Sequence, residues 1–277
     1  VSGEGDVGGL IGRDVDRSEL IVNATATGQV TATGDDVGGL IGFSARPKTL
    51  ENIRATGYVM GDKQVGGVVG DARSEIELIN ATASGDVKGT QYVGGLAGEL
   101  YQPTITDATA TGDVTSTATA GSSYAGGLIG EMPAGTISAS AATGNVTAAG
   151  SHAGGLIGLL QDAEPAQINE SYATGDVTGN QSVGGLAGKA IRTNITNTYA
   201  TGSVDGNASL GGLVGNVSGG NVTLSYAVGA VADEPAAGGL IGTVHNSPTV
   251  QNSYWDNQTT ERTSSAGAGA QSLRTVE

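Results

Sequence analysis

Val183-Gly184-Gly185-Leu186-Ala187-Gly188 decides the fold, because the chain repeats nearly the same six residues along most of its length. Variants of this Val-Gly-Gly phrase recur at intervals of 27 to 32 residues and begin at nine positions: Val7, Val37, Val65, Val93, Ala125, Ala153, Val183, Leu210 and Ala237. A period in this range is typical of solenoid proteins, in which each repeat is one unit stacked on the next. The sequence therefore predicts a repeat architecture.

A second part of each repeat aligns on one glycine, which stands at Gly28, Gly57, Gly85, Gly112, Gly144, Gly175, Gly202 and Gly229, with Asn257 in the last repeat. Around this glycine column an aliphatic residue stands seven places before, an alanine two places before and a valine two places after, as in Ile21, Ala26 and Val30. Alternate residues of a strand point to opposite faces, so these columns are predicted to point inward. The residue three places before the glycine then points outward, and it varies: Thr25, Arg54, Thr82, Thr109, Ala141, Tyr172, Tyr199, Tyr226 and Tyr254.

These columns predict an all-β fold, namely a single-stranded parallel β-solenoid of about nine coils with 27 to 32 residues each. Strand chirality favours a right-handed coil. We expect about three short strands per coil, with the Val-Gly-Gly phrase as one of them, and loops at residues 13–17, 43–48, 115–123 and 159–165. The solenoid should cover residues 1–259, with a closing coil near 250–257 where Trp255 replaces the alanine. Residues 260–277 are expected to form a polar, irregular tail or linker.

Composition limits the classes of function. The 277-residue chain carries a formal charge of −15 and has only four lysines, Lys48, Lys63, Lys88 and Lys189. Nucleic acid is therefore not expected as a partner. Few lysines among many acidic residues resemble proteins of salt-loving organisms, although an ordinary acidic soluble surface would look the same. The chain has no cysteine, and no apolar run is long enough for a membrane span in this segment.

The phrase Val-Gly-Gly-Leu-Ile-Gly followed by Asn-x-x-Ala-Thr-Gly-x-Val resembles the GLUG-motif family, and Ser253-Tyr254-Trp255-Asp256 is similar to the usual end of such arrays. The resemblance covers about residues 1 to 260. It implies an array from an exported bacterial or archaeal surface protein, an adhesin-like protein, or the region beside the catalytic part of an immunoglobulin-A-cleaving metallopeptidase. In each case the array itself is not the catalyst, and the resemblance implies that the chain is a segment of a longer polypeptide.

No catalytic, cofactor-binding or metal-binding residue is assigned from the sequence. The two histidines, His152 and His245, stand in non-equivalent places in different coils and are interpreted as surface residues. Residues 184–189 resemble the end of a phosphate-binding loop, but the leading glycine is missing and Ala190 stands where Ser or Thr would bind magnesium. We expect no enzyme activity, and only a low residual chance of a carbohydrate-active site.

Acidic residues form a column one place after the glycine, at Asp86, Asp113 and Asp176. Paired carboxylates can hydrolyse glycosides, but the column also contains Asn, Gln, Ser, Tyr and Ala, which suits polar turn positions better. Together with Asp35, Asp36 and Asp62, these aspartates could bind calcium weakly through oxygen ligands. A solvated acidic face is the alternative.

The tyrosines of the outward column, Tyr172, Tyr199, Tyr226 and Tyr254, are candidates for binding a partner, because exposed aromatic side chains suit sugars and protein surfaces. Stacking that merely shields the sheet is the alternative. A column five places before the glycine holds Asn23, Asn52, Asn80, Asn197 and Asn252, which indicates an asparagine ladder at a turn.

Ten Asn-x-Ser/Thr triplets occur, and some in loops are expected to carry sugar. We favour Asn207, Asn216 and Asn221, followed by Asn145, Asn180 and Asn194.

The sequence thus favours a non-catalytic extracellular structural protein of a prokaryote in a high-salt environment: a cell-surface stalk, an adhesin segment or a filament subunit. The expected partners are other copies or neighbouring domains of the same surface assembly, and glycans or host and cell-surface proteins are left open. One alternative is a non-catalytic module of a larger secreted peptidase or carbohydrate-active enzyme. Another is a viral receptor-binding fibre.

Overall fold

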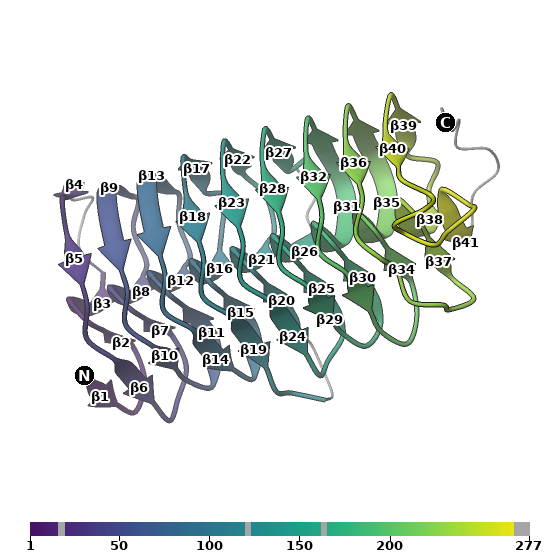
Figure 1. The fold of residues 1–277 in the computed structure, drawn as a ribbon. Coiled ribbons are helices and arrows are strands. Elements are labelled where there is room, and N and C mark those ends of the chain that lie inside the picture. The colour runs from purple at the N-terminus through teal and green to yellow at the C-terminus, as the bar shows by residue number, and fades with distance from the viewer. Residues whose placement is uncertain (16–19, 120–122, 162–164, 269–277) are drawn as a thin grey trace.

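The computed structural model describes residues 1–15, 20–119, 123–161 and 165–268. These residues form a rod in which nine coils lie side by side, with the N-terminus at one end and residue 268 at the other (Figure 1). All the strand pairs are parallel and join each coil to the next, which confirms the predicted β-solenoid.

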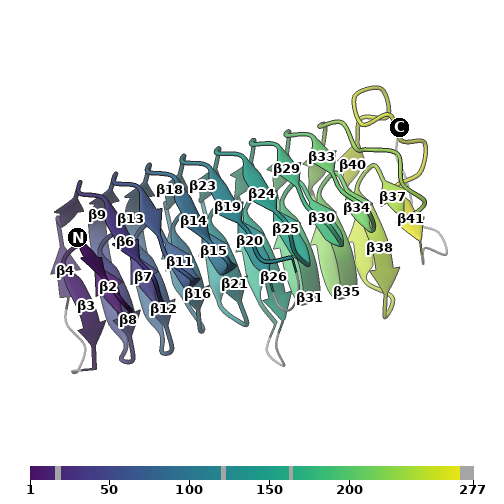
Figure 2. The same cartoon turned by 90° about the horizontal axis from the view of Figure 1, so that it is seen from below.

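The strands form three sheets that run the length of the rod (Figure 2). The valine column after the glycine builds the first sheet, which consists of β1 (Ser2–Gly3), β6 (Val30–Ala32), β10 (Val59–Met60), β14 (Val87–Gly89), β19 (Val114–Ser116), β24 (Val146–Ala148), β29 (Val177–Thr178) and β33 (Val204–Asp205). The start of the Val-Gly-Gly phrase builds the second, which consists of β2 (Val7–Gly8), β7 (Val37–Gly38), β11 (Lys63–Gly66), β15 (Gln91–Gly94), β20 (Tyr124–Gly126), β25 (His152–Gly154), β30 (Ser182–Gly184), β34 (Leu210–Gly211) and β37 (Ala237–Gly238).

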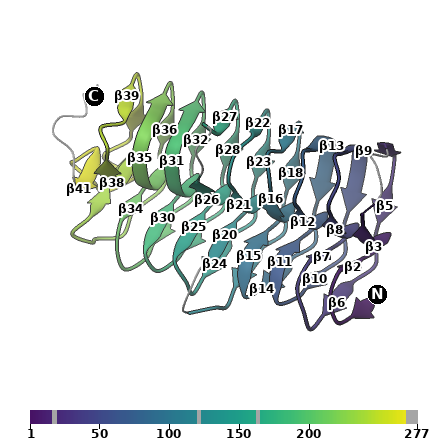
Figure 3. The ribbon, with the colours of Figure 1, turned by 180° about the vertical axis from the view of Figure 1, so that it is seen from behind.

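The third sheet wraps around the remaining sides of each coil in three consecutive rows (Figure 3). Its first row consists of β3 (Ile11–Asp14), β8 (Ile41–Ser44), β12 (Val69–Ala72), β16 (Ala97–Leu100), β21 (Ile129–Met132), β26 (Ile157–Gln161), β31 (Ala187–Thr196), β35 (Val214–Thr223), β38 (Ile241–His245) and β41 (Ala266–Ala268). Its second row consists of β4 (Leu20–Val22), β9 (Lys48–Ala55), β13 (Ile76–Ala83), β17 (Thr104–Thr106), β22 (Thr136–Ser138), β27 (Gln167–Asn169) and β39 (Thr249–Gln251), and continues through β31 and β35. Its third row consists of β5 (Thr25–Ala26), β18 (Thr109–Ala110), β23 (Ala141–Ala142), β28 (Tyr172–Ala173), β32 (Tyr199–Ala200), β36 (Tyr226–Ala227) and β40 (Tyr254–Trp255), and includes the ends of β9 and β13.

The Val-Gly-Gly phrase forms a corner, so the expectation of one strand there was wrong. In the coil around Val65, β11 ends at Gly66, the chain bends, and β12 begins at Val69. The second glycine of the phrase makes the bend compatible with stacking, because a Cβ on Gly67 would lie 2.1 Å from the carbonyl oxygen of Gly95. Its bare backbone also faces the alanine column, at Ala83. Glycine and alanine together therefore keep the coil narrow.

The predicted inward columns are buried. The aliphatic and alanine columns form one hydrophobic cluster, in which Leu50, Leu78 and Ile105 have no exposed surface. The valine columns form a second cluster, which includes Val30, Val59 and the valines that begin the phrase. The inward positions therefore keep the same residue type from coil to coil, because each buried side chain must pack against the equivalent side chain of the next coil.

The asparagine column marks a backbone position of positive φ in every coil. Asn23, Asn52, Asn80, Asn197 and Asn252 have φ between 49° and 55°, and Asn80 donates a hydrogen bond to Asn52 over 2.7 Å. Asparagine tolerates this left-handed conformation better than other side chains do. The predicted turn ladder is confirmed.

The C-terminal end of the rod is closed by Trp255 and the residues after it. Trp255 stands in the alanine column, opposite Ala227, and its ring packs against Gly239. The indole Nε1 donates to the carbonyl of Arg262 over 2.9 Å, and Arg262 in turn donates through Nε and Nη2 to the carbonyl of Val231. These hydrogen bonds satisfy polar groups at the C-terminal edge of the ninth coil.

Part of the expected irregular tail also stacks, which corrects that expectation. The strand β41 pairs with β38 in parallel, with Ile241 opposite Ala266 and Thr243 opposite Ala268. Gly267 fills the place of the phrase's last glycine, since a Cβ there would touch Ala237 of the preceding coil. Residues 269–277 of that tail lie outside the described residues, as do the centres of three predicted loops, at 16–19, 120–122 and 162–164.

Candidate functional surfaces

The tyrosine column lies on the outer face of the third sheet, as predicted. Tyr172, Tyr199 and Tyr226 pair in register, and their rings stack with centroids 4.8 and 5.1 Å apart and planes within 8° of parallel. Tyr254 follows in register from β40. Burial between its two neighbours, together with their phenol groups, raises the pKa of Tyr199 above its ordinary value.

This stacking determines what the tyrosine column can offer a partner. Both ring faces of Tyr199 are covered by its neighbours, and Tyr172 and Tyr226 each have one face covered, so this part of the column presents mainly ring edges and a line of hydroxyl groups. Sugar rings bind best against open faces, whereas a protein edge can pack across ring edges and bond to hydroxyls. Tyr226 and Tyr254 remain 42% and 41% exposed, so the accessible part of the column lies toward the C-terminal end.

The aspartate column after the glycine is a hydrogen-bonded ladder. Asp86 Oδ1 accepts from the backbone N–H of Asp113 over 2.9 Å, and Asp113, Asn145 and Asp176 each accept in the same way from the next coil. One oxygen of each side chain is thus occupied by the backbone, which is the role of a polar turn residue. Among the described residues, no group of three or more His, Cys, Asp or Glu is arranged to hold a metal ion.

Two other aspartates that the calcium hypothesis named are also engaged by neighbouring coils. Asp35 accepts from the backbone N–H of Lys63, and Asp62 accepts from the hydroxyl of Thr90. Asp36 differs, because its Oδ1 is buried without a hydrogen-bond partner.

The six favoured glycosylation positions divide between loops and strands. Asn145, Asn180 and Asn207 lie between strands of the coil, and Asn145 and Asn207 are exposed. Asn194, Asn216 and Asn221 lie within β31 and β35, so the expectation that Asn216 and Asn221 are loop residues was wrong. Asn221 donates through Nδ2, the atom that would carry a sugar, to Asn194 over 2.7 Å, and Asn207 donates in the same way to Asn180 over 3.1 Å. Asn216 is half-buried. Asn145 is exposed, and its hydrogen bond with the next coil uses Oδ1 rather than Nδ2.

The histidines lie far apart along the rod, in β25 and β38. His152 is half-buried rather than on the open surface, and its ring stacks on Tyr124 at 5.2 Å with planes 7° apart. Burial, together with the charge of Lys189, lowers the pKa of His152 to about 4. The imidazole is therefore neutral at ordinary pH and serves as a stacking group.

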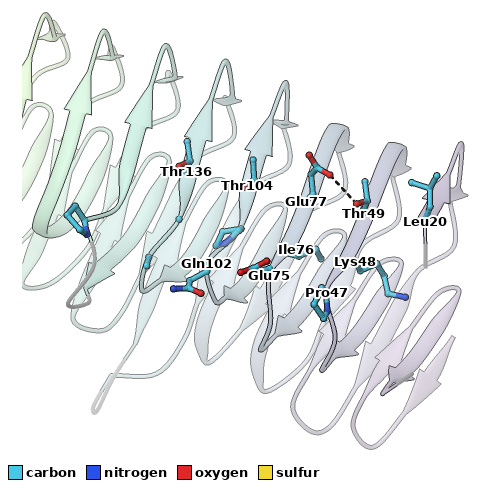
Figure 4. A pocket seen from close by; sticks show the side chains of 14 residues that line it. Leu20, Pro47, Lys48, Thr49, Glu75, Ile76, Glu77, Gln102, Thr104 and Thr136 are labelled. Carbon is cyan, nitrogen blue, oxygen red and sulfur yellow. Dashed lines mark hydrogen bonds between the residues drawn. The ribbon is translucent and has the colours of Figure 1, made fainter. Parts of the chain in front are cut away.

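A shallow groove of about 860 Å³ follows the corner between the first and second rows of the third sheet (Figure 4). It crosses successive coils and is lined by Leu20, Pro47, Lys48, Thr49, Glu75, Ile76, Glu77, Gln102, Pro103, Thr104, Ala134, Gly135, Thr136 and Pro165. Thr49 donates to Glu77 over 3.1 Å, and the buried Lys48 pairs with Asp14. Three prolines are among the lining residues, and sequence reasoning missed the groove because they fall in loops whose alignment varies.

Sequence reasoning also missed a row of buried hydroxyl groups four places before the glycine. Ser171 Oγ accepts from the backbone N–H of Ser140 over 3.1 Å and donates to the carbonyl of Asn169, and Ser225 and Ser253 repeat this pattern. The same column holds Ala24, Ile53, Ala81 and Ala108 in the first four coils. The change from apolar residues in the first four coils to hydroxyl residues in the next five concealed the column.

Comparison with known proteins agrees with this repeat geometry. The family model described as "The GLUG motif" matches residues 89–115 and 179–205. The chain carries the GLUG motif. The predicted resemblance is thereby confirmed at two GLUG repeats, each of which runs from the first sheet through the Val-Gly-Gly corner to the next valine.

One curated protein is similar over a short stretch. Halomucin of Haloquadratum walsbyi (strain DSM 16790 / HBSQ001) is 49% identical over 59 residues, which is 21% of this chain. The matched stretch is 1% of Halomucin's own length. No solved structure matches the chain significantly. The described residues include no helix with the length and hydrophobicity to span a lipid bilayer.

Proposed function

We propose that this chain is a non-catalytic, extracellular structural segment that works as a rigid spacer at the surface of a prokaryotic cell living at high salt. The observation that carries the proposal is the continuous stack of GLUG-type coils, whose two ends lie at opposite ends of the rod (Figure 1). Stacked coils with a spacing of about 4.8 Å make a rod roughly 40 Å long between the first and ninth coils. Such a rod separates whatever is joined to its two ends.

The similarity to Halomucin of Haloquadratum walsbyi supports a place at the surface of a salt-loving prokaryote. The charge of −15 supports the same setting, because self-repulsion destabilises a compact acidic chain unless salt screens it. At about 1 M salt the Debye length falls to roughly 3 Å, which is less than the coil spacing. An acidic rod therefore tolerates its charge best in brine.

The outer surface can vary without disturbing the core, and this supports contacts with neighbouring domains or other copies. We place such a contact at the exposed part of the tyrosine column, Tyr226 and Tyr254, where ring edges and hydroxyls are accessible. A sugar is proposed at Asn145, which is exposed between two strands and bonds to the next coil through Oδ1 rather than Nδ2. No reaction is proposed, and the alternative of a module from a secreted enzyme is not favoured by any described residue.

Gold-labelled antibodies raised against this chain test the location. We expect label on the outer surface of intact cells of the source organism at high salt, with no increase after the cells are permeabilised. Label that appears only after permeabilisation would contradict the proposal.

Thermal unfolding of the purified chain adds a second readout, because the unfolding temperature should rise steadily as sodium chloride is increased.

A further inference from the structure

One corner of the rod, near its N-terminal end, gathers more carboxylates than it pairs. Asp6 and Asp36 stand directly before the Val-Gly-Gly phrases of the first two coils, and Asp71 and Glu99 lie in β12 and β16. We call these four residues the acidic corner. Asp36 contacts Asp6 through its side chain, and the negative charge of Asp71 acts on Asp36.

The repeat geometry explains why these side chains meet. Gln64 occupies in the third coil the place that Asp36 occupies in the second, since Val65 pairs in register with Val37. Gln64 donates to Glu99 of the following coil over 3.2 Å, and Glu99 pairs in register with Asp71. One coil back, the same relation places Asp36 beside Asp71. Gln64 and Asp36 are therefore neighbours in one column, and Asp71 lies beside Asp36 across the second and third coils.

Each of these three side chains has a buried oxygen that accepts no hydrogen bond: Asp36 Oδ1, Gln64 Oε1 and Asp71 Oδ1. Asp71 is the most enclosed, with only 1% of its side chain exposed. Its other oxygen, Oδ2, accepts from Arg73 Nε over 2.7 Å. Three neighbouring acceptors without a donor are unusual in a folded protein, where an unsatisfied buried acceptor indicates a missing ligand such as an ion or water.

The charges favour an ion over water. Arg13 pairs with Asp6 over 2.7 Å, Arg73 pairs with Asp71, and both guanidinium groups lie over the ring of Phe43, at 4.6 and 5.3 Å from its centroid. When all four carboxyl groups of the acidic corner are ionised, these two cations leave two of them uncompensated. Water supplies hydrogen-bond donors to the orphan oxygens but does not remove the negative charge.

We propose that Asp36, Gln64 and Asp71 form a binding site for one divalent cation, and that calcium is the cation it fits. Carboxylate and amide oxygens are ligands that calcium prefers, and calcium accepts irregular geometries completed by water, whereas magnesium demands a near-ideal octahedron. One Ca²⁺ balances the two excess negative charges. The site joins two coils, so its occupancy would stabilise the N-terminal part of the rod. It is distinct from the exposed aspartate column, whose oxygens are bonded to the backbone.

Calorimetric titration of the chelator-treated chain with calcium chloride tests the site. The protein should bind about one Ca²⁺, and its unfolding temperature should rise with calcium more than with sodium chloride at equal ionic strength. Asp36→Asn should weaken binding by about tenfold or more and remove the calcium-dependent rise. Because this substitution relieves repulsion among neighbouring carboxylates, the variant should fold at least as well as the parent without calcium.

Two further variants separate a specific site from general attraction to an acidic protein. Asp205→Asn removes one exposed carboxylate far from the acidic corner and should leave calcium binding unchanged. Gln64→Met preserves the net charge and approximate size but removes the amide oxygen, and it should weaken binding severalfold. Absence of calcium binding in the parent chain would overturn the proposal and leave water as the occupant. Equal weakening by Asp36→Asn and Asp205→Asn would overturn it as well.

Discussion

At the scale of single residues, the left-handed column shows how backbone conformation constrains the sequence. Every coil needs positive φ five places before the glycine, and most coils meet this need with asparagine or aspartate. Leu224 has φ of 53° and a side chain that is 57% exposed, so it has the unfavourable conformation without a packing benefit. The asparagines predicted the turn ladder from the sequence, but the leucine at position 224 gave no sign that this coil also needs positive φ there.

Leu224→Asn should therefore stabilise the protein by about 1 kcal/mol, because asparagine tolerates the left-handed region better than leucine. Asn197→Leu, the reverse change one coil earlier, should destabilise it by a similar amount. Denaturant unfolding of both variants checks this. A loss of stability in Leu224→Asn would show that the leucine makes a contact that matters more than its backbone.

Glu131 gives the rod a dependence on pH. Burial, with the charge of Glu99, raises the pKa of Glu131 to about 7, and burial likewise raises the pKa of Asp36 to about 7 and of Asp71 to about 6. A carboxyl group whose pKa is higher in the folded state binds more protons there than in the unfolded chain. The free energy of unfolding that such a protonated carboxyl group contributes is fully present below its unfolded pKa of about 4. This contribution is lost as the pH rises through its folded pKa, which is about 7 for Glu131.

Glu131→Gln should accordingly raise the unfolding temperature near pH 8 and change it little near pH 5. Glu75→Gln, which alters an exposed carboxylate, is the matched control and should show no such difference. Thermal unfolding across this pH range measures both. A shift of equal size at the two pH values would contradict the assignment of Glu131 as the titrating group.

At the scale of elements, periodicity predicted the columns well and the strand boundaries poorly. Which residues point inward follows from the alternation around Gly28 and its equivalents, and every such column is buried from the second to the eighth coil. The division of the Val-Gly-Gly phrase into two strands was not predicted, because a Val-Gly-Gly-Leu-Ile sequence satisfies both one bent strand and two short ones. The groove of Figure 4 was missed because part of its lining comes from loops of unequal length, whose residues do not align from coil to coil.

The buried hydroxyl row makes a prediction about one such column. Ser171→Ala removes the acceptor for the backbone N–H of Ser140 and should destabilise the protein by about 1–3 kcal/mol, the cost of an unsatisfied buried donor. Ser84→Ala, at an exposed position, should have almost no effect. Chemical unfolding of the two variants provides the test, and equal stabilities would mean that the row does not contribute.

The glycine column offers a comparison within one set of equivalent positions. A Cβ on Gly57 would lie 2.1 Å from the carbonyl oxygen of Gly28, whereas a Cβ on Gly28 would meet nothing within 4 Å. Gly57→Ala should therefore cost about 1–3 kcal/mol through forced backbone movement, and Gly28→Ala should be tolerated. If both substitutions destabilise the chain equally, the glycines are required for backbone conformation rather than for close stacking.

At the scale of the whole molecule, the central claim is that each repeat adds one coil at a constant spacing. The fold class followed from the sequence because the same phrase must pack on itself nine times, and only a solenoid satisfies that requirement. The closure of the C-terminal end was predicted only in part. The sequence indicated the role of Trp255, but the polar composition of residues 260–277 did not indicate that β41 stacks on β38. The acidic corner was not predicted, because Asp36 and Asp71 meet only when one coil lies on the next.

Pulsed electron spin resonance tests this claim most directly, since the chain has no cysteine and labelled thiols can be placed at will. Spin labels would be attached to Cys at Thr25 together with Tyr172, Tyr226 or Tyr254, all of which belong to the outward column. The rod predicts backbone separations of about 24, 34 and 38 Å, which correspond to five, seven and eight coil spacings. Distances that rise linearly with the number of coils would confirm the stack, and distances that level off or do not follow coil number would contradict it.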